Sequence, residues 1–288
     1  MRVLVNGVRL FFDVDGAALV PDGPALRRKP TLIVLHGGPG ADHSTLKPWF
    51  ARFADIAQVI WLDHRANGRS DDGPPEAETL AQWGDDVAGF CAALEIEHPI
   101  IYGLSFGGFV AQSAATRHPD LPARLILAST ACRSVFERKY DAFEAMGGPE
   151  SRRAAERFWG GAIEGDPTVV DDWDRHCRPY YNTRPQDPDG RTRMVRRAAT
   201  EARFFKAEGE RWRMDFRADL ARVRCPTLVL AGDRDPVTPL ADAEEIAASL
   251  PPNLLRYEVV AGAGHGPHRD RPAETERILR SFILEPHS

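Results

Sequence analysis

The chain has 288 residues, of which 43% are hydrophobic and 27% charged, a balance typical of a globular protein with one large domain or one domain carrying an insertion. Its 37 Lys and Arg residues are outnumbered by 42 Asp and Glu residues, and this net charge of -5 gives no electrostatic basis for nucleic-acid binding. No run approaches the roughly 18 consecutive apolar residues that a membrane span needs, so we expect no membrane partner.

The predicted elements begin with an antiparallel hairpin, because Asn6-Gly7 is a strong turn signal between "RVLV" and "VRLFFDVD". Near-continuous apolar runs then recur, as in strands buried on both faces of a parallel sheet: "TLIVLHG" (31–37), "QVIWLD" (58–63), "PIIYGLS" (99–105), "RLILAST" (124–130), "TLVLAGD" (227–233) and "LRYEVVAG" (255–262). Helical segments separate them, and in 80–94 one core-facing stripe is predicted: Leu80, Trp83, Val87, Phe90 and Leu94. This alternation predicts an α/β fold with a mostly parallel sheet of about eight strands and helices on both faces.

The alternation lapses between residues 134 and 215, where Arg, Glu, Trp, Tyr and Pro are frequent and no core-quality strand is present. Unstructured loops longer than roughly 15 residues are uncommon in compact domains, so we expect an inserted, mostly helical cap. The predicted division is a first core part at 1–133, the cap at 134–215 and a second core part at 216–288. Five side chains are candidates for lining a pocket, although packing of the cap on itself explains them equally well: Met146, Trp159, Trp173, Met194 and Trp212.

The segment "GLSFG" at 103–107 matches G-x-S-x-G, the pattern of a nucleophilic serine on a tight turn between a strand and a helix. A buried strand precedes it and the amphipathic "FVAQSAATRHP" follows it. Such a sharp turn requires a strained backbone at Ser105 and leaves no room for side chains at Gly103 and Gly107. We interpret Ser105 as a nucleophile; the alternative is a glycine-rich packing turn whose serine only caps the helix.

The segment "HGGPG" at 36–40 ends the first buried strand with a turn that is able to aim a backbone N–H outward. The amide of Gly38, together with the amide of Phe106, is our candidate for an oxyanion hole. A plain turn at the end of the strand is the alternative. His36, within this turn, is interpreted as a hydrogen-bonded structural histidine.

A serine needs a neighbouring base, and the base needs an acid that fixes its tautomer. Two later segments, "GDRDPVTP" and "GAGHGPH", each follow a buried strand, and they supply Asp235 as the candidate acid and His265 as the candidate base. Asp233 is the alternative acid, but Asp235 lies two residues farther from the strand and so has the longer reach. His268 is the alternative base.

Neither a metal nor another cofactor is expected. His265, His268 and Asp270 have an H-x-x-H-x-D spacing, but loop residues at this spacing seldom bind a metal without further ligands. The four cysteines lie far apart without metal-like spacing, which indicates free thiols in a reducing compartment: Cys91, Cys132, Cys177 and Cys225. We therefore expect a cytoplasmic protein.

These motifs together resemble the α/β-hydrolase family along nearly the whole chain. Within it, "HGGPG" and a D-x-R-x-x-G-x-S segment at 63–70 are similar to those of the proline iminopeptidases. The resemblance implies an α/β-hydrolase fold with Ser105, Asp235 and His265 as a catalytic triad. It also implies Gly38 and Phe106 as oxyanion donors.

The chain departs from the iminopeptidase pattern at several positions. The segment more usually reads D-Q-R-G-x-G-x-S, whereas this chain has His64, Ala66 and Asn67. Some members have an acidic residue directly after the catalytic aspartate, where this chain has Pro236. Glu201 in the cap is the candidate for the carboxylate that would bind a free amino terminus in such a peptidase.

The sequence therefore predicts a serine hydrolase that cleaves a small ester, lactone or amide through an acyl-enzyme on Ser105. A proline iminopeptidase is the alternative within this class. A non-hydrolytic member of the fold, such as a lyase, an oxygenase or a receptor, is the alternative outside it. The expected partner is a small-molecule substrate, and the chain is expected to be a monomer or a homodimer.

Overall fold

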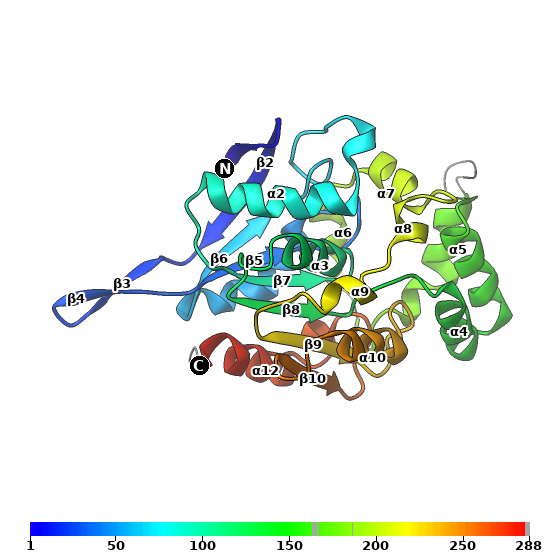
Figure 1. Cartoon of the computed structure of the whole chain (residues 1–288). Coiled ribbons are helices and arrows are strands. Elements are labelled where there is room, and N and C mark those ends of the chain that lie inside the picture. Colours follow the sequence, from blue (N-terminus) through cyan, green and yellow to red (C-terminus); the bar gives the residue numbers. More distant parts are fainter. Residues whose placement is uncertain (163–165, 167, 186, 286–288) are drawn as a thin grey trace.

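One eight-stranded sheet organises the molecule, in the strand order β1-β2-β6-β5-β7-β8-β9-β10 (Figure 1). The computed structural model describes residues 1–162, 166, 168–185 and 187–285. β1 pairs antiparallel with β2 and β2 antiparallel with β6, whereas the other pairings in this sheet are parallel. The strands of this sheet are β1 (Arg2–Val5), β2 (Val8–Asp15), β5 (Thr31–Leu35), β6 (Gln58–Leu62), β7 (Ile100–Leu104), β8 (Arg124–Ala128), β9 (Thr227–Gly232) and β10 (Leu255–Val260). The predicted hairpin and all six predicted strands are confirmed, but β10 lies at the edge of the sheet with mostly half-buried side chains and is therefore not buried on both faces.

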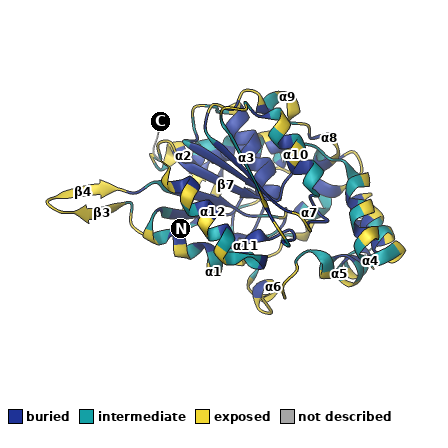
Figure 2. Cartoon of the chain, turned by 90° about the horizontal axis from the view of Figure 1, so that it is seen from below, coloured by how far each residue is buried: buried dark blue, intermediate teal, exposed yellow. Residues whose placement is uncertain are grey.

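The molecule also contains a second sheet of two strands, which was not predicted from the sequence. Its strands, β3 (Leu19–Asp22) and β4 (Ala25–Arg28), pair antiparallel and project from the body as an arm (Figures 1 and 2). Their side chains are mostly exposed, as the yellow colour in Figure 2 shows. Because the arm buries no face, its sequence lacks the apolar pattern by which the other strands are recognised.

The helices of the core cover both faces of the sheet. Successive residues of β5 point to opposite sides: Ile33 and Leu35 pack with helices α2 and α3, and Leu32 and Val34 pack with α1 and α12. The core helices are α1 (Lys47–Phe50), α2 (Leu80–Ala93), α3 (Phe106–Arg117), α9 (Arg217–Leu220), α10 (Leu240–Ser249), α11 (Pro267–Asp270) and α12 (Pro272–Leu284). The predicted stripe of α2 faces the core, with Leu94 partly buried beyond its end.

The segment between β8 and α9 forms helices, most of which lie beyond the end of the sheet (Figure 1). They are α4 (Phe136–Trp159), α5 (Thr168–His176), α6 (Gly190–Arg193), α7 (Ala198–Phe205) and α8 (Glu210–Arg213). The segment leaves and re-enters the core at one place, because Arg133 and Asp215 form a β-bridge and the Phe216 amide donates to the Cys132 carbonyl at 2.8 Å. The division into core and cap stays a prediction, and residues 163–165, 167 and 186 of the predicted cap lie outside the described residues.

Short 3-10 helices complete the chain path at His43–Thr45, Ala51–Asp55, Pro75–Ala77 and Arg178–Tyr180. In the described part of the chain, every helix is too short or too polar to cross a membrane.

Candidate active site

The predicted site residues follow the carboxyl ends of four parallel strands. Gly38 comes after β5, Ser105 after β7, Asp235 after β9 and His265 after β10. Because these strands are parallel, their carboxyl ends meet at the same edge of the sheet. A cavity of about 300 Å³ opens there between the core and the helices that follow β8, and Gly38, Ser105 and His265 all line it.

Ser105 lies on a tight turn between β7 and α3. Its φ of 54° is in the left-handed region, a strained conformation for a residue with a side chain, as predicted. A Cβ atom at Gly103 would lie 2.3 Å from the Gly107 carbonyl oxygen, and one at Gly107 would lie 2.2 Å from the Leu35 carbonyl oxygen. Both positions therefore have room for glycine alone, and this prediction is confirmed. The Ser105 side chain makes no capping hydrogen bond to α3, which argues against the capping alternative.

The two amides predicted as oxyanion donors flank this turn. Phe106 is the first residue of α3, so its N–H has no partner within the helix. Gly38 has a φ of 138° and lines the cavity, and its neighbour Gly37 approaches the Ser105 side chain, with 3.5 Å between an ideal Gly37 Cβ and Ser105 Cβ. Within residues 1–162, 166, 168–185 and 187–285, neither the Gly38 nor the Phe106 amide donates a hydrogen bond. Both remain available to a ligand, and their role stays a prediction.

The His265 imidazole is held by Asp235 and by the segment that follows β8. Nδ1 of His265 lies 2.8 Å from Oδ2 of Asp235, and the backbone N–H of His265 donates to the Tyr181 carbonyl at 2.6 Å. Asp235 is 4% exposed, and its Oδ1 accepts hydrogen bonds from the backbone amides of Val237 and Thr238. The Thr238 hydroxyl donates to Oδ2 at 2.7 Å. These contacts fix the carboxylate behind the imidazole, so that Nδ1 carries the proton and Nε2 is free to act as a base.

The alternative acid, Asp233, and the alternative base, His268, lie in surroundings that differ from those of Asp235 and His265. Asp233 accepts a hydrogen bond from the Gly262 amide at 2.6 Å and so joins the two loops that carry Asp235 and His265. His268 packs against the rings of Trp49 and Phe50, and its Nδ1 has no hydrogen-bond partner in the described part of the chain. Burial, together with the nearby positive charge of Arg269 and the proximity of His265, lowers the pKa of His268 to about 3. His268 is therefore neutral and has no acid to orient it.

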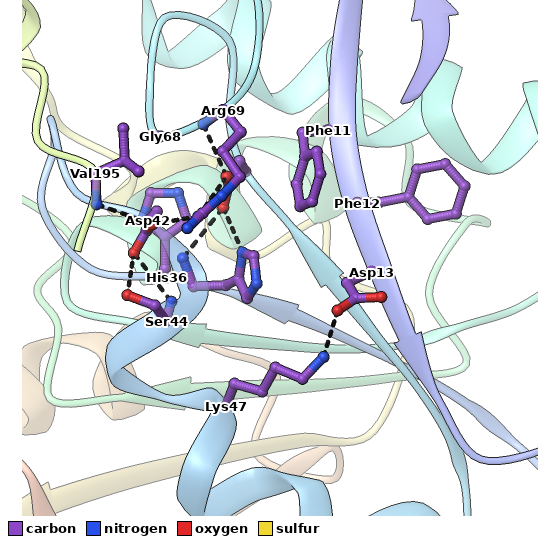
Figure 3. Close-up of polar contacts among 12 residues, drawn as sticks. Phe11, Phe12, Asp13, His36, Asp42, Ser44, Lys47, Gly68, Arg69 and Val195 are labelled. Carbon is purple, nitrogen blue, oxygen red and sulfur yellow. Dashed lines mark hydrogen bonds and ion pairs between the residues drawn. The ribbon is translucent and has the colours of Figure 1, made fainter. Parts of the chain in front are cut away.

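Two acidic residues hold the segment that directly follows the glycine turn (Figure 3). Asp42 binds Arg69, and it accepts hydrogen bonds from the backbone amides of Ser44 and Val195, both at 3.0 Å. Asp63 accepts a hydrogen bond from Nδ1 of His43 at 2.7 Å. Because Val195 follows α6, Asp42 ties this segment to the predicted cap.

Two of the positions that depart from the iminopeptidase pattern make contacts here: Asn67 binds the glycine turn, and Ala66 binds α7. The side-chain oxygen of Asn67 accepts a hydrogen bond from the Gly40 amide at 2.6 Å, and the Gly40 carbonyl accepts one from the Arg197 amide at 2.7 Å. The Ala66 carbonyl accepts a hydrogen bond from the Thr200 hydroxyl at 2.8 Å. His36 is buried, and its Nδ1 lies 2.7 Å from the Gly37 carbonyl, so the prediction of a hydrogen-bonded structural histidine is confirmed.

Glu201, predicted as a substrate-binding carboxylate, lines the cavity. Its Oε2 is 2.5 Å from Nη2 of Arg196, so its charge is neutralised by an arginine of the same segment. Of the five candidate pocket residues, Trp159, Trp173 and Met194 line the cavity. Met146 is not part of the lining, and Trp212 is an exposed surface residue.

Some residues at this site belong to no sequence motif that indicates a role. Thr238 is the most direct omission, since it binds the Asp235 carboxylate and lines the cavity; its position three residues after Asp235 is the signal that would have indicated it. Asp270 accepts backbone hydrogen bonds and does not face the two histidines of the H-x-x-H-x-D spacing. Within the described ranges, no group of three or more His, Cys, Asp or Glu side chains has an arrangement suited to a metal ion. The four cysteines are free and buried.

Comparison with known proteins agrees with this architecture. Residues 30–272 match the model of a protein family described as the alpha/beta hydrolase fold. The putative carbamate hydrolase RutD of Serratia proteamaculans is 25% identical over 89% of this chain and 91% of its own length. The 3-oxoadipate enol-lactonase 1 of Acinetobacter baylyi is 27% identical over 87% of this chain and 88% of its own length. The proline iminopeptidase PfmaB of Pestalotiopsis fici is 27% identical over 95% of this chain and 98% of its own length.

A solved structure shares the same fold. The crystal structure of a proline iminopeptidase from Mycobacterium smegmatis superposes with a TM-score of 0.77 and 22% sequence identity. The match covers 98% of this chain and 97% of the other.

Proposed function

Because the chain belongs to the α/β-hydrolase family, we propose that it is a serine hydrolase that cleaves a small ester, lactone or amide through an acyl-enzyme on Ser105. One observation supports this proposal most strongly. The imidazole of His265, which has a buried carboxylate 2.8 Å from Nδ1, lines the same cavity as a serine on a strained turn. A helix-capping or packing role for the serine would require neither the imidazole nor the carboxylate.

In the proposed mechanism, Ser105 Oγ attacks the substrate carbonyl carbon while Nε2 of His265 takes the hydroxyl proton. The imidazolium that forms is stabilised by Asp235. When the tetrahedral intermediate collapses, Nε2 returns the proton to the leaving oxygen or nitrogen. A water molecule then attacks the acyl-enzyme with the same proton transfers, which releases the acid and restores Ser105.

The oxyanion of each tetrahedral intermediate would be bound by the amides of Gly38 and Phe106. Phe106 N–H belongs to the first turn of α3, where the helix dipole also favours negative charge. Loss of one such donor costs about 3 kcal/mol of transition-state stabilisation in related chemistry. The donors and the general base therefore contribute comparably to the rate.

Replacement of the proposed nucleophile tests the mechanism directly. Ser105→Ala is expected to abolish turnover of short-chain nitrophenyl esters and to abolish labelling by a fluorophosphonate, without lowering the melting temperature. Ser249→Ala, which removes a hydroxyl at the end of α10, is the matched control and should retain both activities. Labelling of the Ser105→Ala protein would remove this residue from the mechanism.

A proline iminopeptidase is the second candidate, since Glu201 lines the cavity and a 27% identical relative bears that name. The ion pair between Glu201 and Arg196 opposes this assignment, because a substrate ammonium would have to compete with the arginine for the carboxylate. A panel that contains a prolyl anilide and nitrophenyl esters separates the two candidates. Strong preference for the anilide would reverse our ordering.

A further inference from the structure

Arg211 is a buried cation that lines the same cavity as Ser105. It belongs to α8 and is 3% exposed. Its guanidinium lies over the ring of Phe109, 4.5 Å from the ring centroid. Phe109 follows Ser105 by one turn of α3, and its amide donates to the Ser105 carbonyl at 3.3 Å. The positive charge of Arg211 therefore lies against a side chain that is one helical turn of α3 away from the proposed nucleophile.

This guanidinium has no carboxylate partner among the residues that the structure describes. Its one hydrogen bond goes to the Met214 sulfur at 2.9 Å, and a thioether is a weak acceptor for a group with five N–H donors. Asp242 is the carboxylate that raises the pKa of Arg211, but its oxygens are bound by Lys139 at 2.8 Å and Arg138 at 2.9 Å. Burial lowers the pKa of Arg211 to about 10, so the group still carries its charge at neutral pH.

The other arginines that line the cavity are less buried than Arg211, and three of them bind a carboxylate. Arg178 and Arg191 both bind the Asp174 carboxylate, at 2.5 and 2.7 Å, and Arg196 binds Glu201. Arg269 is only partly buried, and its Nη1 has no hydrogen-bond partner in the described chain, while Asp270 and Asp187 raise its pKa as Asp242 raises that of Arg211. Arg211 is thus the most fully buried of these cavity arginines, and in the described chain no carboxylate oxygen binds its guanidinium. A buried cation without a counter-ion is unfavourable unless a bound group supplies the negative charge.

We propose that Arg211 binds a carboxylate at the far end of the substrate's acyl chain, so that the enzyme prefers monoesters, lactones or amides of dicarboxylic acids. This assignment rests on the proposed serine-hydrolase function. The acyl group stays attached to Ser105 after the first step, and Arg211 lines the cavity into which that acyl group would extend. Guanidinium and carboxylate match as a bidentate pair. The cavity of about 300 Å³ suits a small acyl group of this kind.

Substrate pairs that differ in the terminal charge test the proposal. The monoethyl esters of glutaric and adipic acids are compared with ethyl pentanoate and ethyl hexanoate, and hydrolysis is followed by proton release. The wild type should have the higher kcat/KM on the charged esters. Arg211→Met should lower kcat/KM on the charged esters by roughly 10- to 100-fold, the usual range for a hydrogen bond to a charged group, and change the neutral esters by less than about threefold.

Two further variants make this result specific. Arg211→Lys keeps the charge but loses the planar arrangement of N–H donors, so its preference for the charged esters should be weaker than that of the wild type but still present. This variant tests the proposal even if Arg211→Met is too unstable to assay. Arg213→Met removes an arginine of the same short helix whose side chain is exposed, and it should leave both substrate classes unchanged. Equal losses on charged and neutral esters in Arg211→Met, or a wild-type preference for the neutral esters, would overturn the proposal.

A binding measurement separates this proposal from the proposed function. Glutarate is titrated calorimetrically into the Ser105→Ala protein, which cannot form an acyl-enzyme. Saturable binding that is lost in the Ser105→Ala, Arg211→Met double variant supports the carboxylate site even if no ester is hydrolysed. Glutarate binding that is absent, or unchanged by Arg211→Met, contradicts the site even if Ser105 proves to be the nucleophile.

Discussion

Asp235 and Asp233 lie two positions apart after the same strand, and their surroundings distinguish them. The Asp235 carboxylate accepts hydrogen bonds from two amides and the Thr238 hydroxyl, which leaves Oδ2 aimed at the imidazole. Asp233 instead accepts a hydrogen bond from a backbone amide of the loop before His265. The proposed roles of acid and loop anchor follow from these contacts.

Exchanging each carboxylate for an amide should separate these roles. Asp235→Asn places an NH₂ group opposite Nδ1 of His265 and favours the wrong tautomer, so kcat should fall roughly a thousandfold or more. Asp233→Asn keeps an acceptor for the Gly262 amide and should lower kcat by less than about fivefold. Ester hydrolysis and melting curves of both variants provide the measurement. Comparable losses of kcat in the two folded variants would contradict our choice of Asp235.

At the residue scale, the sequence predicted groups that are recognised by a local motif. Ser105 has glycines at fixed positions, and His265 follows a buried strand in a glycine-rich loop. Arg211 has no such signature, because the segment between β8 and α9 contains many arginines. Its burial and its lack of a counter-ion arise from side chains that are distant in sequence, such as Phe109 and Lys139, and no local pattern encodes them.

At the scale of elements, a buried carboxylate reinforces the backbone hydrogen bond that joins the loop before α11 to the segment after α5. Asp270 is fully buried and accepts hydrogen bonds from the amides of Gly264, Thr183 and Arg184, at 2.7, 3.0 and 3.1 Å. Gly264 directly precedes His265. The position of the proposed base relative to the predicted cap therefore depends on this carboxylate.

Asp270→Asn should loosen both segments, because an amide keeps one acceptor oxygen and turns an NH₂ group toward a backbone N–H. We expect a loss of about 2 kcal/mol in the free energy of unfolding. Faster amide hydrogen exchange should be confined to residues 181–185 and 262–266. Asp189→Asn, at an exposed position before α6, is the control. Unchanged exchange in both segments of Asp270→Asn would show that the carboxylate does not fasten them.

Elements with a buried face were predictable, and elements without one were not. The central strands are apolar runs because both faces of the sheet are covered. The arm of β3 and β4 was missed because its side chains are mostly exposed, although Asp22-Gly23 at its tip is a hairpin signal. The helices after β8 were expected as a group, but their limits depend on packing against the core and could not be predicted individually.

At the scale of the whole molecule, three histidines are built into the core as neutral rings. His36 and His64 pack against each other near the glycine turn with tilted rings, 4.5 Å between ring centroids, and His268 packs beside Trp49. Burial lowers the pKa of all three, that of His268 to about 3, and the proximity of His36 lowers the pKa of His64 further. In the unfolded chain each ring would titrate near 6.5.

This difference makes the fold sensitive to acid. Between about pH 6.5 and the lowered folded-state pKa, the unfolded chain binds more protons than the folded one, so stability is complete above pH 6.5 and falls as the pH decreases. Each such histidine contributes a slope of up to about 1.4 kcal/mol per pH unit in that window. His268→Phe keeps the ring against Trp49 and Phe50 and forfeits no hydrogen bond from Nδ1, but removes the titration.

Urea unfolding at pH 7, 6 and 5 should therefore show a shallower loss of stability in His268→Phe than in the wild type, by about 1.4 kcal/mol per pH unit once the pH is below 6. Carboxylates titrate equally in both proteins, so their contribution cancels in the comparison. His98→Asn, which removes an exposed histidine, should retain the wild-type slope. If His268→Phe retained the wild-type slope as well, the His268 ring would be protonated in the folded protein, and its environment would have to contain an acceptor or solvent that stabilises the imidazolium.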